Sequence, residues 1–255
     1  MKEKQITEII IRNHFERLLN ALESDVIIAG GGPSSLTAAF YLAKAGKKVV
    51  VLERKLSLGG GTWGGGMGFK FAVVEGNCLE ILKDMGIRYK HEGADLYSVD
   101  SIELASGLIF SALQAGAEIF NLVSVEDLVL SDGRVKGVVI NSSPIEIAKL
   151  HVDPITLMAK AVVDATGHDL EVVRVFLRKN NVKLYTETGD ILGERSMDAE
   201  EGEKITVEKT GEVFPGLYVA GMAACACFGG PRMGPIFGGM LLSGRKLAEI
   251  LKEKV

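Results

Sequence analysis

Residues 25–53 read DVIIAGGGPSSLTAAFYLAKAGKKVVVLE and form the most informative stretch of this 255-residue chain. An apolar run ends in three glycines, a helical pattern follows over residues 36–45, and a second apolar run covers residues 48–53. Glycines between a strand and a helix permit a tight turn and expose backbone N–H groups to a pyrophosphate. The sequence therefore predicts a βαβ unit whose glycine turn, including Gly30 and Gly32, binds a dinucleotide.

Three side chains near that turn are candidates for contacts with the dinucleotide. Ser35 stands where the glycine pattern usually has Gly or Ala, and its hydroxyl is available to a phosphate or a ribose. Glu53 ends the second predicted strand, where an acidic side chain accepts hydrogen bonds from ribose hydroxyls. The neighbouring Arg54 is placed to reach a phosphate instead.

Further glycine-rich stretches extend the pattern along the chain. LGGGTWGGGM at residues 58–67 follows the acidic residue and brings the backbone over the nucleotide with little side-chain bulk. VDATG at residues 163–167 and GLYVAGM at residues 216–222 resemble the late strand-turn and the final nucleotide-contacting strand of two-dinucleotide-binding flavoproteins. The predicted fold class is therefore α/β, a Rossmann-like dinucleotide-binding fold of the two-dinucleotide-binding flavoprotein type.

The remaining periodicity places further elements around this unit. An amphipathic helix is expected over residues 5–22, and Asp132-Gly133 is typical of a β-hairpin turn. We expect a single domain, residues 1–255, with a small β element inserted midway. The other expected helices cover 76–85, 101–115, 169–180 and 237–252, and the other expected strands cover 117–122, 124–130, 134–140, 159–165 and 216–220.

Composition limits the possible functions. Hydrophobic residues make up 47% of the chain and charged residues 24%, which excludes a disordered chain. A net charge of −4 argues against a nucleic-acid or anionic-membrane surface. Three cysteines are too few for a disulfide framework, and the N-terminus lacks the pattern of a signal peptide. We expect a soluble, cytoplasmic protein.

Histidines suggest where chemistry takes place. His14 and His91 lie among polar residues, so solvent exposure is the simplest interpretation. In His151-Val152-Asp153-Pro154 an extended backbone would turn the imidazole and the carboxylate to one side. His168 follows a glycine turn at the end of a predicted strand, where ligands bind in open α/β sheets. Such residues suit a divalent metal such as Fe(II), and structural histidines are the alternative.

An arginine lies in a rigid loop before the last helix. Residues 229–235 read GGPRMGP, and this loop presents Arg232 between glycines and prolines. A guanidinium can bind a carboxylate with two hydrogen bonds. The alternative is an ordinary surface arginine.

Taken together, these motifs resemble the thiamine thiazole synthase family in its archaeal-type, sulfide-dependent branch. The resemblance runs from about residue 6 to residue 251. It implies that NAD is a co-substrate: nicotinamide leaves, and the ADP-ribose part condenses with glycine and sulfide to an adenylated thiazole carboxylate in an Fe(II)-dependent reaction. The motifs that carry it are GGGPSSLTAA, ERKLSLGGGTWGGGMGF, HVDP, DATGHD, YVAGM and PRMGPIFGGMLLSG.

The resemblance also assigns roles to individual residues. Asp153 and His168 would bind iron, and Arg232 would hold the carboxylate of glycine. His151 stands where the eukaryotic branch has a cysteine that donates its sulfur, so sulfide would come from solution and the enzyme would turn over many times. His151 would be a proton shuttle or a substrate contact, or else a third metal ligand. Contacts to NAD are implied for Ser35, Glu53, Arg54, Gly61, Val125, Met222 and the stretch His151, Val152 and Asp153.

Family members form ring-like octamers with sites shared between adjacent subunits, so a homo-oligomer is expected here. Two other functions fit the same glycine pattern. One is an FAD-dependent oxidoreductase, because the pattern alone does not choose between dinucleotides. The other is a non-catalytic module that binds NAD.

Overall fold

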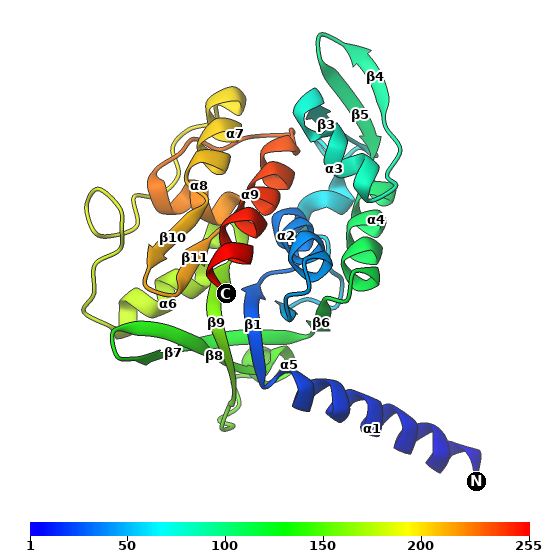
Figure 1. Ribbon diagram of the computed structural model, residues 1–255, viewed down its shortest axis with the longest axis vertical. Coiled ribbons are helices and arrows are strands. Elements are labelled where there is room, and N and C mark those ends of the chain that lie inside the picture. The colour runs from blue at the N-terminus through cyan, green and yellow to red at the C-terminus, as the bar shows by residue number, and fades with distance from the viewer.

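A parallel sheet forms the centre of the computed structural model, which describes residues 1–255 (Figure 1). β1 (Glu23–Ala29) pairs in parallel with β2 (Val49–Glu53) and β9 (Ile155–Asp164). Along its main path the sheet runs in the order β10-β11-β9-β1-β2-β6, where β6 is Glu118–Asn121, β10 is Gly211–Phe214 and β11 is Leu217–Val219. Only β10 is antiparallel to its neighbour on this path. The glycine turn follows β1, the first strand of the predicted βαβ unit, and leads into α2 (Pro33–Lys44), the helix that connects β1 to β2.

Helices cover both faces of this sheet, which explains why its strands are continuous apolar runs. Neighbouring residues of β1 point to opposite faces: Ile28 belongs to a core cluster of 31 buried residues and Ile27 to one of 25. The first cluster lies under α2, α3 (Leu79–Asp84), α4 (Ser101–Gln114) and α9 (Gly238–Lys254). The second lies under α6 (Glu171–Lys179) and α8 (Met222–Phe228).

The predicted hairpin exists and belongs to the main sheet. β7 (Val123–Ser131) and β8 (Arg134–Ser142) pair in antiparallel fashion around Asp132-Gly133, where both residues have a positive φ. β8 continues the pairing to β9. A separate sheet in the order β3-β5-β4 was not predicted and projects from the body (Figure 1). Its strands are Phe71–Glu75, Leu96–Asp100 and Lys90–Gly93, respectively.

The predicted helices and strands are confirmed with shifted ends, and several other elements were not predicted. The helix expected at 76–85 is a 3₁₀ turn at Gly76–Cys78 followed by α3. β9 begins several residues before the expected strand, at Ile155. A helix over Ala199–Glu208, α7, was not predicted. Two further 3₁₀ turns cover Gly60–Gly64 and Gly167–Asp169, and the short α5 covers Ser143–Ile147.

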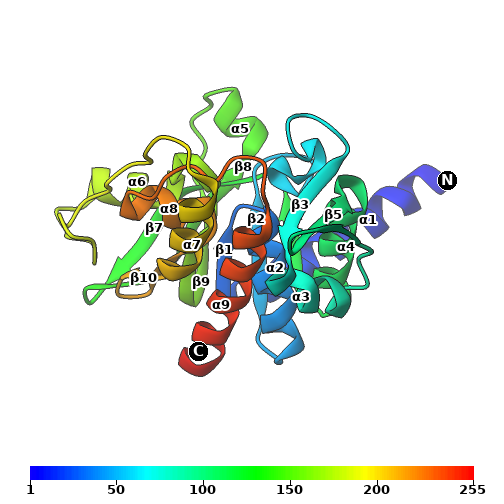
Figure 2. The same ribbon diagram turned by 90° about the horizontal axis from the view of Figure 1, so that it is seen from above.

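The first helix stands away from the body of the chain. α1 (Lys2–Ala21) extends outward in both views (Figures 1 and 2), and most of its apolar side chains are exposed. Near its end, Arg17 forms an ion pair with Glu118 at the edge strand β6. The predicted amphipathic helix is therefore confirmed as a helix, and only its last turn, with Leu18 and Ala21, packs against the core of this chain. No helix in the structure combines the length and apolar character required to cross a membrane.

Candidate functional site

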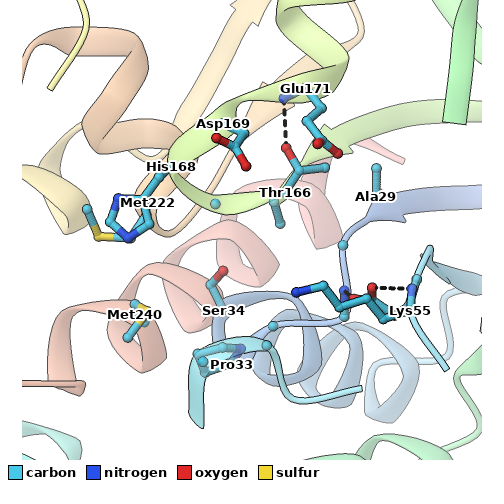
Figure 3. A pocket seen from close by; sticks show the side chains of 18 of the residues that line it. Ala29, Pro33, Ser34, Lys55, Thr166, His168, Asp169, Glu171, Met222 and Met240 are labelled. Atoms are coloured by element: carbon cyan, nitrogen blue, oxygen red, sulfur yellow. Dashed lines mark hydrogen bonds between the residues drawn. The ribbon is translucent and has the colours of Figure 1, made fainter. Parts of the chain in front are cut away.

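A cavity of about 770 Å³ opens at the carboxyl ends of β1, β2 and β9 (Figure 3). Its wall combines the glycine turn, the end of β2, the turn after β9 and the loop before α9. Ligands of open α/β sheets bind at this position. The wall contains the predicted site residues Gly30, Gly32, Glu53, Arg54, Gly61, Val125, His168, Met222 and Arg232.

Backbone contacts shape the dinucleotide end of the cavity. Gly30 has a φ of +96°, and a Cβ atom there would lie 2.4 Å from the carbonyl oxygen of Ala165. The N–H of Gly31 donates to Oε2 of Glu53 at 2.8 Å, and its carbonyl accepts from the N–H of Gly59 at 2.8 Å. α2 begins directly after Gly32, so its N-terminus faces the cavity. Free N–H groups at a helix N-terminus favour a bound anion such as a pyrophosphate.

Glu53 is nearly buried, at 8% exposure, and is held on both oxygens. Besides the bond from Gly31, its Oε1 accepts from the backbone N–H of Lys55 at 2.8 Å. A carboxylate oxygen can accept a second hydrogen bond, so the side chain remains able to bind ribose hydroxyls. The contact of Glu53 with ribose hydroxyls stays a prediction, and the hydrogen bonds from Gly31 and Lys55 leave acceptor positions for it.

The structure distinguishes the two serines of the motif. Ser35 is fully buried behind the cavity wall, and its hydroxyl has no hydrogen-bond partner. Ser34 lines the cavity instead (Figure 3) and is only 4% exposed. The sequence shows two adjacent serines, and the direction of each side chain on α2 determines that Ser34 rather than Ser35 lines the cavity.

Charged side chains line the wall near the end of β2. Arg54 forms an ion pair with Glu171, the first residue of α6, and both line the cavity. Burial raises the pKa of Glu171, which was not predicted as a site residue. Lys55 also lines the cavity and forms no ion pair. Of these groups, Lys55 is the cation that no carboxylate of the chain pairs with, so it is available to a phosphate.

A buried carboxylate fixes the turn that carries His168. Asp164 ends β9 and is fully buried; it accepts from the N–H and the hydroxyl of Thr166 at 2.9 and 2.6 Å, and from the N–H of Val173 at 2.9 Å. The hydroxyl of Thr166 accepts from the N–H of Glu171 at 2.9 Å (Figure 3). Burial raises the pKa of Asp164. The network holds the short turn in which His168 lies half exposed on the cavity wall.

The imidazole of His168 has a carboxylate behind it. Its Nδ1 lies 2.6 Å from Oε1 of Glu194, a residue that sequence reasoning did not find. An imidazole held in this way by a carboxylate is a frequent arrangement for metal ligands. The chain contains no group of three or more His, Cys, Asp or Glu that could hold a metal ion. His168 therefore fits a metal in this cavity only if other ligands come from substrate, water or a second chain.

Arg232 lines the cavity from the loop before α9. It is exposed, and its guanidinium pairs with no carboxylate of the chain. Its backbone is anchored: the N–H donates to the carbonyl of Arg195 at 3.3 Å, and its carbonyl accepts from Asp198 at 3.1 Å. A free guanidinium on a fixed loop can bind a small carboxylate.

Five methionines contribute to the apolar surface of the cavity. Met222 was predicted as a contact, and other methionines come from the glycine-rich loop, the segment before α7, the loop before α9 and α9 itself. Thioether side chains pack against flat rings with little conformational restriction. The full set is Met67, Met197, Met222, Met233 and Met240.

The segment His151–Asp153 does not reach this cavity. It lies exposed before β9, where the carbonyl of Val152 accepts from Nδ2 of Asn141 at 3.2 Å. The ten residues of β9 separate it from His168, a span of about 30 Å at the usual rise of a strand. Within one chain, Asp153 and His168 therefore cannot share a metal ion. His14 and His91 are exposed, on α1 and β4, as expected.

Comparison with known proteins identifies the relatives of this chain. The model of the family described as the Thi4 family matches residues 7–237. The chain belongs to the Thi4 family. A thiamine thiazole synthase of Thermococcus kodakarensis is 54% identical over 254 residues, which cover 99% of each protein. That of Methanothermobacter thermautotrophicus is 53% identical over 251 residues, covering 98% of this chain and 97% of the relative.

A solved Thi4 structure agrees with the fold. The crystal structure of Thermovibrio ammonificans THI4 matches with a TM-score of 0.98 at 48% identity, and the match covers 100% of this chain and 98% of that one. The predicted α/β, Rossmann-like dinucleotide-binding class is thereby confirmed, as is the resemblance inferred from the motifs. Similarity to archaeal Thi4 relatives extends over nearly the whole chain.

Proposed function

We propose that this Thi4 protein is a thiamine thiazole synthase that converts NAD, glycine and sulfide to an adenylated thiazole carboxylate and releases nicotinamide. One observation carries the proposal: a single cavity joins a dinucleotide-type glycine turn to an unpaired arginine and a carboxylate-held histidine. A hydride-transfer enzyme needs the first of these features, whereas the other two suit a small carboxylate substrate and a metal. The Thi4 family and its curated relatives support the same assignment.

NAD would occupy the end of the cavity near the glycine turn. The pyrophosphate would lie at the N-terminus of α2, with Lys55 and Arg54 as nearby cations. Glu53 would accept hydrogen bonds from ribose hydroxyls. Gly61, Val125 and Met222 would complete the contacts along the wall. This arrangement would leave the ribose of the nicotinamide side free to react near His168.

Glycine would bind through its carboxylate to Arg232. The guanidinium is free of protein carboxylates, and its loop is tied to residues 195–198 by backbone hydrogen bonds. Two parallel N–H···O bonds would fix the orientation of glycine and direct its amino group toward the ribose carbonyl formed after nicotinamide leaves. Fixed orientation lowers the entropic cost of a reaction between two substrates.

Fe(II) would be held by His168 of one chain and Asp153 of a second copy. This division follows from the length of β9, which keeps the two residues of one chain apart. The metal would supply Lewis-acid chemistry and a template for sulfide when bound. The exposed apolar residues beside Asp153, among them Ile147 at 79% and Leu150 at 61% exposure, favour contact with another chain. We therefore propose a homo-oligomer with shared sites.

His151 would carry protons in the tautomerisation and dehydration steps, or would contact substrate. It would enter the neighbouring site on the same loop as Asp153.

Sulfide would come from solution. All three cysteines are buried, and burial raises the pKa of Cys78 to about 12, of Cys225 to about 11 and of Cys227 to about 12. Thiols in this state are poor nucleophiles, which supports a catalyst that turns over many times.

The test is anaerobic incubation of the pure protein with NAD, glycine, sulfide and Fe(II), followed by mass spectrometry of the small molecules. We expect more than one equivalent of adenylated thiazole per subunit and none when sulfide is omitted. Intact NAD, together with release of FAD on denaturation, would instead support a flavin-dependent oxidoreductase. Intact NAD that remains bound would support a binding module.

A further inference from the structure

Glu194 lies in a long segment without helix or strand, yet its carboxylate occupies a defined place. The segment joins α6 to α7, and the side chain of Glu194 is 20% exposed. Its Oε1 lies 2.6 Å from Nδ1 of His168, although the two residues are 26 positions apart. Holding a carboxylate and an imidazole in one geometry costs side-chain entropy, and a fixed backbone lowers this cost.

Backbone hydrogen bonds do fix that segment. The N–H groups of Leu192, Gly193 and Arg195 donate to carbonyls in and just after α8, at 3.1, 3.0 and 2.9 Å. The Nε of Arg195 donates to the carbonyl of Gly229 at 2.7 Å. Glu194 lies in the middle of this paired stretch. Its position is therefore set by α8 rather than by His168, and the histidine is the partner that is oriented.

The same pairing connects Glu194 to the loop of Arg232. Arg195 and Pro231 form an isolated parallel bridge, and the N–H of Arg232 donates to the carbonyl of Arg195 at 3.3 Å. One stretch of backbone thus holds the carboxylate behind His168 and the guanidinium proposed for glycine. The backbone positions of Glu194 and Arg232 are therefore linked through Arg195.

We propose that Glu194 is a positioning residue that fixes the tautomer and the ring orientation of His168. An ionised carboxylate can only accept a hydrogen bond, so the neutral imidazole must carry its proton on Nδ1. Nε2 is then unprotonated and available on the side of the ring away from Glu194. This inference rests on the proposed function, in which Nε2 of His168 binds the metal.

The first experiment observes the ring without metal. Full-length protein labelled with ¹⁵N at histidine is studied by magic-angle-spinning NMR at an alkaline pH, where histidine rings are neutral, and His168→Ala identifies the signals of that ring. We expect wild-type His168 with a protonated Nδ1 and an unprotonated Nε2. Glu194→Ala should give a mixture of tautomers. Glu194→Gln, whose carbonyl can still accept from Nδ1, should restore most of the wild-type pattern.

The second experiment titrates the same proteins with Co(II) and follows its absorption bands. Loss of the carboxylate should weaken Co(II) binding by about 10–100-fold in Glu194→Ala, with a smaller loss in Glu194→Gln. The matched control is Glu187→Ala, an exposed carboxylate of the same segment with no hydrogen-bonded partner, which should bind as the wild type does.

Two results overturn the proposal. One is a wild-type ring with the proton on Nε2, and the other is a Glu194→Ala protein whose ring signals and Co(II) affinity are unchanged. A failure of the proposed function has a different signature. If His168→Ala binds Co(II) as tightly as the wild type, the metal assignment is wrong, whereas a change of tautomer in metal-free Glu194→Ala still supports the positioning role.

Discussion

The glycine turn at residues 30–32 is enclosed by the fold, whereas the segment at residues 151–153 lies exposed before β9. The turn is fixed by hydrogen bonds to Glu53 and Gly59 within the chain. The exposed segment has one hydrogen bond, from Asn141. In the proposed function, the glycine turn of one chain would hold the dinucleotide, and a second copy would contribute residues 151–153 to the metal site.

The largest effect should follow from breaking the enclosed turn. Gly30→Ala places a Cβ 2.4 Å from the carbonyl oxygen of Ala165, on a backbone with a φ of +96°. Clash and strain together should lower the free energy of unfolding by about 3 kcal/mol or more. Urea denaturation measures this. A variant that unfolds at the wild-type urea concentration would contradict the account of the turn.

The chain offers a matched control two residues away. Gly32 has a φ of −80°, and a Cβ there would meet no atom within 4 Å. Gly32→Ala should therefore change the free energy of unfolding by less than about 1 kcal/mol. The pair separates backbone geometry from a general sensitivity of the glycine turn to added side chains.

The next largest effect should follow from replacing Arg232, the side chain proposed to bind the substrate glycine. Arg232→Ala removes charge-assisted hydrogen bonds to the substrate carboxylate and should raise the KM for glycine by about 10–100-fold. The Kd for NAD should stay unchanged, because the dinucleotide end is built elsewhere. Arg232→Lys should recover only part of the loss. Arg178→Ala, an exposed arginine on α6, is the control and should behave as the wild type. An unchanged KM in Arg232→Ala would remove the proposed glycine site.

A smaller effect should follow at the dinucleotide end from Glu53→Gln. The amide has one acceptor oxygen, so either the N–H of Gly31 or that of Lys55 would face an NH₂ group. An unsatisfied buried donor costs about 1–3 kcal/mol. Calorimetry should show NAD binding weakened by roughly tenfold, with the KM for glycine little changed. Equal losses for both substrates would mean that the two ends of the cavity are not independent.

The smallest effect concerns the cysteines, where no change is expected. Because Cys78, Cys225 and Cys227 are buried and their pKa values are raised, none should give up sulfur. After many turnovers, the intact mass of the protein should be unchanged, and three thiols should react with a thiol reagent in denaturant. Loss of one sulfur per chain would contradict the proposal that sulfide comes from solution.

The sequence predicts the enclosed turn better than the rest of the site, for a physical reason. The β1-α2-β2 unit is determined by local patterns: apolar runs, glycines and a helical period within residues 25–53. The helix α7 also had a local signal, since the side chain of Asp198 caps it by accepting from Glu201 at 3.2 Å. The hairpin of β4 and β5 had no such local signal in its turn, because Ala94 and Asp95 adopt a positive φ there and neither is a glycine.

Other site residues depend on contacts between distant parts of the chain. Glu194 reaches His168 from an irregular segment, and Glu171 reaches Arg54 across the cavity, at separations of 26 and 117 residues. No local period or spacing marks such pairs. Asp153 and His168 lie just before and just after β9, which is longer than the strand predicted over residues 159–165. The motifs of the sequence do not show the length of this strand. Only the structure shows that the two residues cannot meet within one chain.

The most direct test of the central claim mixes two inactive chains. Asp153→Ala and His168→Ala are each purified alone and also co-expressed with different tags, and adenylated thiazole is measured for the three preparations. Each variant alone should be inactive. Random assembly should restore about a quarter of wild-type activity, because half of the chains supply His168 and half of their neighbours supply Asp153. Mixed assemblies as inactive as the separate variants, or full activity of Asp153→Ala alone, would contradict a site shared between two copies.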